Sequence, residues 1–144
     1  MDPETKREII LEHYQNPRNK TMEHDNKAIK VNSNNESCID NINLYVTIEN
    51  NVIKNITFDG EACAISTSST SIMITNLIGK TIEEALDYID NFDKMLEEKE
   101  YNKDILKEAL VYDEIYKQKS RKTCASLPYR GINKVLLKYK ESNK

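Results

Sequence analysis

Alternation of apolar and polar residues between positions 42 and 58 constrains the fold of this chain more than any other feature. In the first half of the run an apolar residue occupies every second position: Ile42, Leu44, Val46 and Ile48. The residues between them face the opposite side: Asn43, Tyr45 and Thr47. The alternation resumes after Asn50-Asn51 with Val52, Lys54, Ile56 and Phe58. Because asparagine tolerates positive φ, Asn50-Asn51 suits a tight turn, and the whole run predicts an antiparallel β-hairpin.

The rest of the chain predicts helices and one further strand. A first helix begins at Pro3, capped by Asp2, and ends near Asn16 because Pro17 follows. Residues 26–33 predict a weak strand. Further helices are predicted over 66–78, after a capping box formed by Thr81 and Glu84, within 93–119, and from about 126–128 onward. Three strands followed by helices predict one α+β domain over residues 1–144: a small three-stranded antiparallel sheet with helices packed on one face.

The composition excludes several classes of protein. The chain has 144 residues with 21 basic and 24 acidic side chains, and this slightly acidic balance argues against bulk nucleic-acid binding. Its apolar runs are too short to span a bilayer, and its first residues, MDPE, lack the apolar region of a secretion signal. We therefore expect a cytoplasmic protein with no nucleic acid and no membrane as partner.

Three cysteines carry the most specific chemistry in the sequence. Cys38 precedes the hairpin, Cys63 follows it, and Cys124 precedes the predicted last helix, while Asp40 lies two residues after Cys38. Three thiolates and one carboxylate form a set that tetrahedral Zn²⁺ accepts, and iron–sulfur clusters are also held mainly by thiolates. A position near a helix N-terminus is expected to lower the pKa of Cys63 and of Cys124.

Spacing alone leaves other interpretations open. A single buried cysteine is usually a small apolar side chain, and separations of 25 and 61 residues match no zinc-finger or ribbon pattern. His13 lies on a predicted apolar stripe and His24 in a polar loop, and neither has a cysteine or histidine close by. The serine- and threonine-rich run 66–71 indicates a tightly packed helix start rather than a cluster of nucleophiles.

Four segments, taken in order, resemble the NifU N-terminal, IscU and SufU family of iron–sulfur cluster assembly proteins. They are residues 13–19 (HYQNPRN), 35–40 (NESCID), 58–66 (FDGEACAIS) and 124–127 (CASL), which match the family patterns H-Y-x-N-P-R-N, N-P-x-C-G-D, F-x-G-x-x-C-x-I-S and C-A/S-x-L. Two of the family's positions differ here, since Glu36 replaces its proline and Ile39 its glycine. If the glycine position needs positive φ, Ile39 would be strained.

Within this family, two features of the sequence resemble SufU proteins more than IscU proteins. The long gap between Cys63 and Cys124 leaves room for a SufU-like helical insertion, which we place at about residues 88–110. The residue before the last cysteine is Thr123, where IscU proteins usually carry histidine, and Arg121 stands where SufU-like proteins carry arginine. The expected fold is therefore the SufE/NifU-like α+β domain.

The resemblance implies both a site and a role. The metal ligands would be Cys38, Asp40, Cys63 and Cys124, with zinc as the resting metal. The protein would take sulfur as a persulfide from a SufS-like, pyridoxal-phosphate-dependent cysteine desulfurase and pass it to a downstream scaffold or to apo-protein recipients. Cys38 is the expected sulfur acceptor, because it lies in an irregular segment and can move without breaking a helix. Arg121 either favours thiolate at the site or forms a surface salt bridge.

Two alternatives remain at this point. The same ligands could carry a 2Fe–2S or 4Fe–4S cluster that is assembled on this protein as a scaffold and transferred. A zinc hydrolase with Asp40 as general base belongs to a different class, but the sequence offers it no histidine ligands. Zinc-dependent sulfur transfer is the favoured interpretation, and cluster assembly is the alternative.

Overall fold

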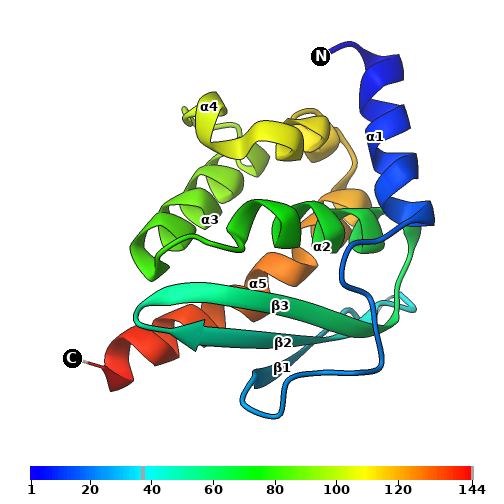
Figure 1. Ribbon diagram of the computed structural model, residues 1–144. Coiled ribbons are helices and arrows are strands. Elements are labelled where there is room, and N and C mark those ends of the chain that lie inside the picture. Colours follow the sequence, from blue (N-terminus) through cyan, green and yellow to red (C-terminus); the bar gives the residue numbers. More distant parts are fainter. Residues whose placement is uncertain (37, 144) are drawn as a thin grey trace.

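The computed structural model describes residues 1–36 and 38–143 of the chain, so Ser37 of the NESCID segment and residue 144 lie outside the described residues. A three-stranded antiparallel sheet has the order β1-β2-β3, formed by β1 (Ile29–Asn34), β2 (Asn41–Glu49) and β3 (Val52–Glu61). The α-helices are α1 (Pro3–Gln15), α2 (Ala64–Leu77), α3 (Ile82–Leu96), α4 (Lys103–Leu106) and α5 (Lys119–Ser142). Two short 3-10 helices cover Lys107–Tyr112 and Ile115–Lys117. The helices lie on one side of the sheet (Figure 1), which confirms the predicted α+β architecture.

The β2–β3 hairpin forms as predicted but contains a bulge. Asn50 and Asn51 have φ values of 52° and 64°, the left-handed conformation that a tight hairpin turn requires. The register shifts between Thr47 and Ile48, so that Ile48 pairs with Ile53 whereas Thr47 pairs with Asn55. Ile53 is consequently buried and Lys54 exposed, and the predicted alternation of Val52, Lys54 and Ile56 is wrong over its first residues. A bulge places two residues opposite one, and nothing in the local pattern indicates it.

The core lies between the sheet and the helices α2, α3 and α5. The buried face of the hairpin contributes Ile42, Leu44, Val46, Ile53, Ile56 and Phe58. The ring of Phe92 in α3 stacks on that of Tyr129 in α5 with centroids 3.9 Å apart, and Tyr112 meets Phe92 edge-on. A Cβ on Gly131 of α5 would lie 3.1 Å from Leu44 Cδ1. The absence of a side chain there lets α5 cross the sheet closely, which brings its N-terminal half to the end of the sheet where the cysteines gather.

The HYQNPRN segment ends α1 and attaches it to its neighbours. Asp2 caps α1 as predicted, accepting a hydrogen bond of 2.8 Å from the Thr5 amide, and the helix ends at Gln15. His13 is buried, and its Nδ1 lies 2.7 Å from the hydroxyl of Ser71 in α2. The Arg18 amide donates to the same hydroxyl at 2.8 Å. This segment therefore fixes α1 against α2, and His13 is a packed helix residue, as its place on the apolar stripe indicated.

The last helix differs from the prediction. It begins at Lys119 rather than near residues 126–128, and Pro128 lies inside it. Proline has no amide hydrogen and normally interrupts a helix, which is why the sequence favoured a later start. The carbonyl that Pro128 leaves without its helical partner belongs to Cys124, and the Ser66 hydroxyl lies 3.1 Å from it. This contact shares the single Ser66 hydroxyl proton with Asp40 and partly compensates for the missing helical bond, and Cys124 lies within α5 rather than before it.

Residues 88–110 contain the end of α3, a connecting loop, α4 and part of the first 3-10 helix, and no strand. The predicted ligands Cys38, Asp40, Cys63 and Cys124 all lie outside this segment. Its assignment as a SufU-type insertion within one domain of residues 1–144 stays a prediction. Among the described helices, none combines the length and the apolar character needed to cross a bilayer.

Candidate metal centre

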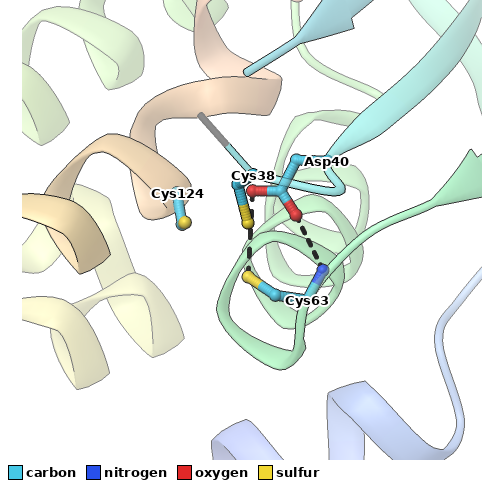
Figure 2. Close-up of side chains that lie close together, drawn as sticks. All are labelled: Cys38, Asp40, Cys63 and Cys124. Atoms are coloured by element: carbon cyan, nitrogen blue, oxygen red, sulfur yellow. Dashed lines mark hydrogen bonds between the residues drawn. The ribbon is translucent and has the colours of Figure 1, made fainter. Parts of the chain in front are cut away.

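Cys38, Asp40, Cys63 and Cys124 converge at one end of the sheet. One ligand atom from each residue lies within 4.8 Å of the corresponding atom of every other residue in the set. Cys38 comes from the loop before β2, Asp40 from the residue preceding β2, Cys63 from the residue preceding α2, and Cys124 from α5 (Figure 2). Four side chains from three separate regions of the chain thus share one site, although Cys63 and Cys124 are 61 residues apart.

Asp40 is buried and held by hydrogen bonds from its neighbours. The Cys63 amide donates to Asp40 Oδ1 at 2.7 Å, and the Ser66 hydroxyl donates to Asp40 Oδ2 at 2.6 Å. Burial raises the pKa of the Asp40 carboxyl, but the hydrogen bonds from Ser66, Cys63 and Cys124 outweigh it and hold the pKa below its usual value. The amides at the start of α2 also favour a negative charge at this position. Asp40 is therefore a fixed anion with a defined orientation.

Gly60 explains how Asp40 comes so close to Cys63. Gly60 has φ +111°, and a Cβ there would lie 2.2 Å from the carbonyl oxygen of Asn41, the residue after Asp40. Ile42 pairs with Gly60 across the two strands. Only glycine permits this close approach of β2 to the end of β3, which accounts for the glycine in the FDGEACAIS segment.

Cys63 is the N-cap residue of α2. Its Sγ accepts a hydrogen bond of 3.4 Å from the Ser66 amide and lies 3.8 Å from Asp40 Oδ2. A sulfur atom at this position takes the place of the hydroxyl or carboxylate that usually caps a helix. The prediction that Cys63 lies at a helix start is confirmed.

Cys124 is buried, and its environment differs from the predicted one. Burial, together with the neighbouring Asp40 and Cys63, raises the pKa of the Cys124 thiol to about 12. The expectation of a lowered pKa is wrong for this residue. It assumed a helix N-terminus at Cys124, whereas α5 begins five residues earlier, at Lys119, and the thiol is buried beside Asp40.

Cys38 is the exposed member of the set. Its amide donates to the Asn35 carbonyl at 3.0 Å, in a loop with no helix or strand. Ile39 beside it is 67% exposed and does not belong to the residues with positive φ. The isoleucine therefore fits this loop without backbone strain and without displacing a ligand.

A cavity of about 530 Å³ opens onto the three cysteines. It is also lined by Ile65 of α2 and by Arg121 of α5, whose side chain is exposed. None of the ion pairs formed within the described part of the chain involves Arg121. The surface salt bridge considered for Arg121 is thus not formed among the described residues, and Arg121 instead lines the cavity beside the cysteines.

The donor set fits a tetrahedral metal ion. Two sulfurs bound tetrahedrally at ~2.3 Å from a zinc ion lie ~3.8 Å apart, so the observed separations need only a small contraction. Both histidines lie elsewhere, since His13 contacts Ser71 while His24 lies 2.8 Å from Asp59 and stacks on Tyr45. Ser66, which the sequence did not indicate as a site residue, contacts the site with its hydroxyl from within the serine-rich run 66–71. The spacing of three residues from Cys63 was the available signal.

The sheet order and the helices on one face define a small α+β domain. Three cysteines and one aspartate gather at one end of its sheet and could hold a metal ion. The sequence model of the NifU-like N terminal domain matches residues 5–144, and the chain belongs to this family.

Two relatives that match nearly the whole chain carry different names. The zinc-dependent sulfurtransferase SufU of Bacillus subtilis is 35% identical over 138 residues, covering 95% of this chain and 92% of the relative. The iron–sulfur cluster assembly scaffold protein IscU of Thermotoga maritima is 30% identical over 131 residues, covering 91% of this chain and 92% of the relative.

Solved structures share the same fold. A crystal structure from Fervidobacterium islandicum, described as an iron–sulfur cluster assembly scaffold for the SUF system, superposes with a TM-score of 0.84 at 30% identity, covering 90% of this chain and 94% of the other. A NifU-like N-terminal protein from Brucella abortus has a TM-score of 0.79 at 20% identity, covering 92% of each chain, and supports the fold alone.

Proposed function

We propose that this protein serves iron–sulfur cluster assembly as a zinc-binding acceptor of persulfide sulfur. The observation that carries the proposal is the convergence of Cys38, Asp40, Cys63 and Cys124 within 4.8 Å, with one cysteine exposed and the others held. The names of the relatives support the same process, since one is called a zinc-dependent sulfurtransferase and another a cluster assembly scaffold.

Zinc is the metal that this donor set suits best. Cys38, Asp40, Cys63 and Cys124 would hold it, and the bound ion would keep the cysteines deprotonated at neutral pH. This matters most for Cys124, because its thiol otherwise retains its proton, with a pKa of about 12. Asp40 already carries its charge, since its hydrogen bonds keep the pKa of its carboxyl low.

Sulfur transfer to Cys38 is a thiol–disulfide-type exchange. The Cys38 thiolate attacks the terminal sulfur of the donor persulfide, and a new S–S bond forms at Cys38 Sγ. The S–S bond of the donor breaks, and its electron pair leaves with the donor's cysteine as a thiolate. No external oxidant or reductant is consumed. Cys38 suits this role because it is exposed and lies in a loop, while Cys63 caps α2 and Cys124 is buried in α5.

A persulfide donor of this kind is a pyridoxal-phosphate-dependent cysteine desulfurase. The cavity beside Cys38 is open, and the exposed guanidinium of Arg121 at its mouth would attract the anionic persulfide or an acidic group of the donor. The sulfur would then pass to a downstream scaffold or to apo-protein recipients, in the cytoplasm.

Metal content and sulfur transfer test the proposal together. Protein purified anaerobically should be colourless with one zinc per chain, and incubation with the organism's own desulfurase and cysteine should load one persulfide sulfur. Removing zinc with a chelator should abolish the loading, because zinc keeps the ligand set assembled. A colourless, zinc-loaded protein that takes no sulfur would overturn the proposal.

Cluster assembly on the same ligands is the second candidate, favoured by the 30% identity to an IscU scaffold. It predicts a different result in the same experiment, namely brown protein with iron, sulfide and stable cluster absorbance. The transfer role is favoured by Arg121 and by Thr123, the residue before Cys124, because both positions resemble the SufU type.

A further inference from the structure

Ser66 lies at the centre of the site although it is not one of the expected ligands. It belongs to the first turn of α2, three residues after Cys63, and its side chain is fully buried. Serine at such a position usually makes a local hydrogen bond within its helix. The Ser66 hydroxyl instead faces Asp40 and the backbone of α5.

The hydroxyl of Ser66 contacts three of the four expected ligand residues. Its oxygen lies 2.6 Å from Asp40 Oδ2, 3.1 Å from the Cys124 carbonyl oxygen and 3.5 Å from Cys63 Sγ. Of the hydrogen bonds found among the described residues, none joins Ser66 to Cys38. One side chain therefore links the three internal ligands and leaves out the exposed one.

The contact with Cys124 depends on Pro128. The helical partner of the Cys124 carbonyl would be the amide of residue 128, and proline has none. The carbonyl is consequently available to Ser66, and this fixes the turn of α5 that carries Cys124 against the start of α2. The Ser66 hydroxyl lies closer to the Asp40 carboxylate than to the Cys124 carbonyl. This is expected if its single proton points mainly at the carboxylate.

We propose that Ser66 is a positioning residue that holds Asp40, Cys63 and Cys124 as a pre-arranged three-ligand set, so that Cys38 can leave the metal without the metal being lost. The inference rests on the proposed function and adds to it a named residue for metal retention. It explains why three ligands are tied together while the acceptor thiol is free to move. Groups that orient metal ligands commonly contribute tenfold to hundredfold in affinity.

Replacing Ser66 by alanine removes the hydroxyl without adding bulk. A Co²⁺ titration of metal-free protein measures affinity and also reports ligand geometry through the visible absorption bands of the ion. Ser66→Ala should bind Co²⁺ about tenfold to hundredfold more weakly, with altered bands. Ser66→Thr, which keeps the hydroxyl, should restore both. Equal affinity and identical bands for Ser66→Ala and the unaltered protein would overturn the inference.

Ser69→Ala is the matched control. Ser69 is also fully buried in α2, and its hydroxyl donates to a carbonyl of α5, that of Ala125, at 2.5 Å. The Ser69→Ala variant loses the same kind of helix-to-helix contact, but the lost hydroxyl does not contact a ligand side chain. Ser69→Ala should therefore be destabilised like Ser66→Ala in thermal unfolding but bind Co²⁺ normally. If the two variants lose Co²⁺ affinity equally, the effect of Ser66 is general packing and the inference fails.

A double substitution separates this inference from the proposed function. Cys38→Ser should retain metal on the three remaining ligands. Ser66→Ala should lower metal content more strongly when it is introduced into Cys38→Ser than when it is introduced into the unaltered protein. Retention of metal by the double variant would contradict the role of Ser66 while leaving sulfur transfer by the unaltered protein intact. An unaltered protein that binds no metal would overturn the proposed function and this inference together.

Discussion

Replacing Gly60 by alanine tests how the hairpin brings Asp40 to Cys63. Gly60 has φ +111°, and this conformation costs a residue with a side chain about 1–3 kcal/mol. The new Cβ would also lie 2.2 Å from the Asn41 carbonyl oxygen, where ordinary contact begins at 3.4 Å. β2 must therefore move away from β3 at the Ile42–Gly60 pair, which weakens ladder hydrogen bonds worth about 1 kcal/mol each. With one or two of these hydrogen bonds weakened in addition to the strain, we expect the free energy of unfolding to fall by about 2–5 kcal/mol.

Gly79→Ala is the control that isolates the steric part. Gly79 also has positive φ, +92°, but a Cβ there would meet nothing within 4 Å. Its substitution should cost only the backbone strain, about 1–3 kcal/mol. Urea denaturation of the metal-free proteins, followed by circular dichroism, measures both losses. Gly60→Ala should in addition lose zinc, because the displaced Asn41 carries Asp40 with it, whereas Gly79→Ala should keep it. Equal losses of stability in the two variants would refute the argument from close approach.

The remaining predictions concern a buried histidine and the loop of Cys38. Burial lowers the pKa of His13 despite the attraction of Glu108, so the unfolded chain binds the proton more readily; the stability contributed by neutral His13 is complete above pH 6.5 and is lost as the pH falls through the lowered value. His13→Asn should therefore reduce the slope of unfolding free energy against pH below 6.5, by at most about 1.4 kcal/mol per pH unit, and an unchanged slope would contradict this assignment. Ile39→Gly should leave zinc content unchanged, because the Ile39 side chain is 67% exposed and its φ is not positive; loss of zinc on atomic absorption would show that Ile39 supports the ligand loop.

Local features of the fold could be predicted from the sequence, since they depend on neighbouring residues. Asp2 at the start of α1, the Thr81–Glu84 capping box and the Asn50-Asn51 turn each act within a few positions and appear where they were expected. The bulge at Thr47 could not be predicted, because it depends on how the strands pair. The start of α5 could not be predicted either, because proline's local effect is offset by a contact with Ser66, which is distant in sequence.

The metal site depended on information that spacing does not contain. Cys63 and Cys124 are 61 residues apart, and no periodicity indicates that α5 returns to the start of α2. Family resemblance brought the four residues together as a hypothesis, and the geometry places their ligand atoms within 4.8 Å. Ser66 could not be assigned to the site from the sequence, because a buried serine in a helix is usually a packing residue and two of its three partners, Asp40 and Cys124, are distant in sequence.

Under the proposed function, the exposed Cys38 receives the sulfur while the internal residues retain the metal. The most direct test is incubation with the cysteine desulfurase and cysteine, alkylation of the trapped persulfide, and peptide mass spectrometry of each cysteine. We expect a mass increase of one sulfur atom on the Cys38 peptide, and loss of that signal in Cys38→Ser while some zinc remains bound. A persulfide on Cys124 with none on Cys38 would contradict it.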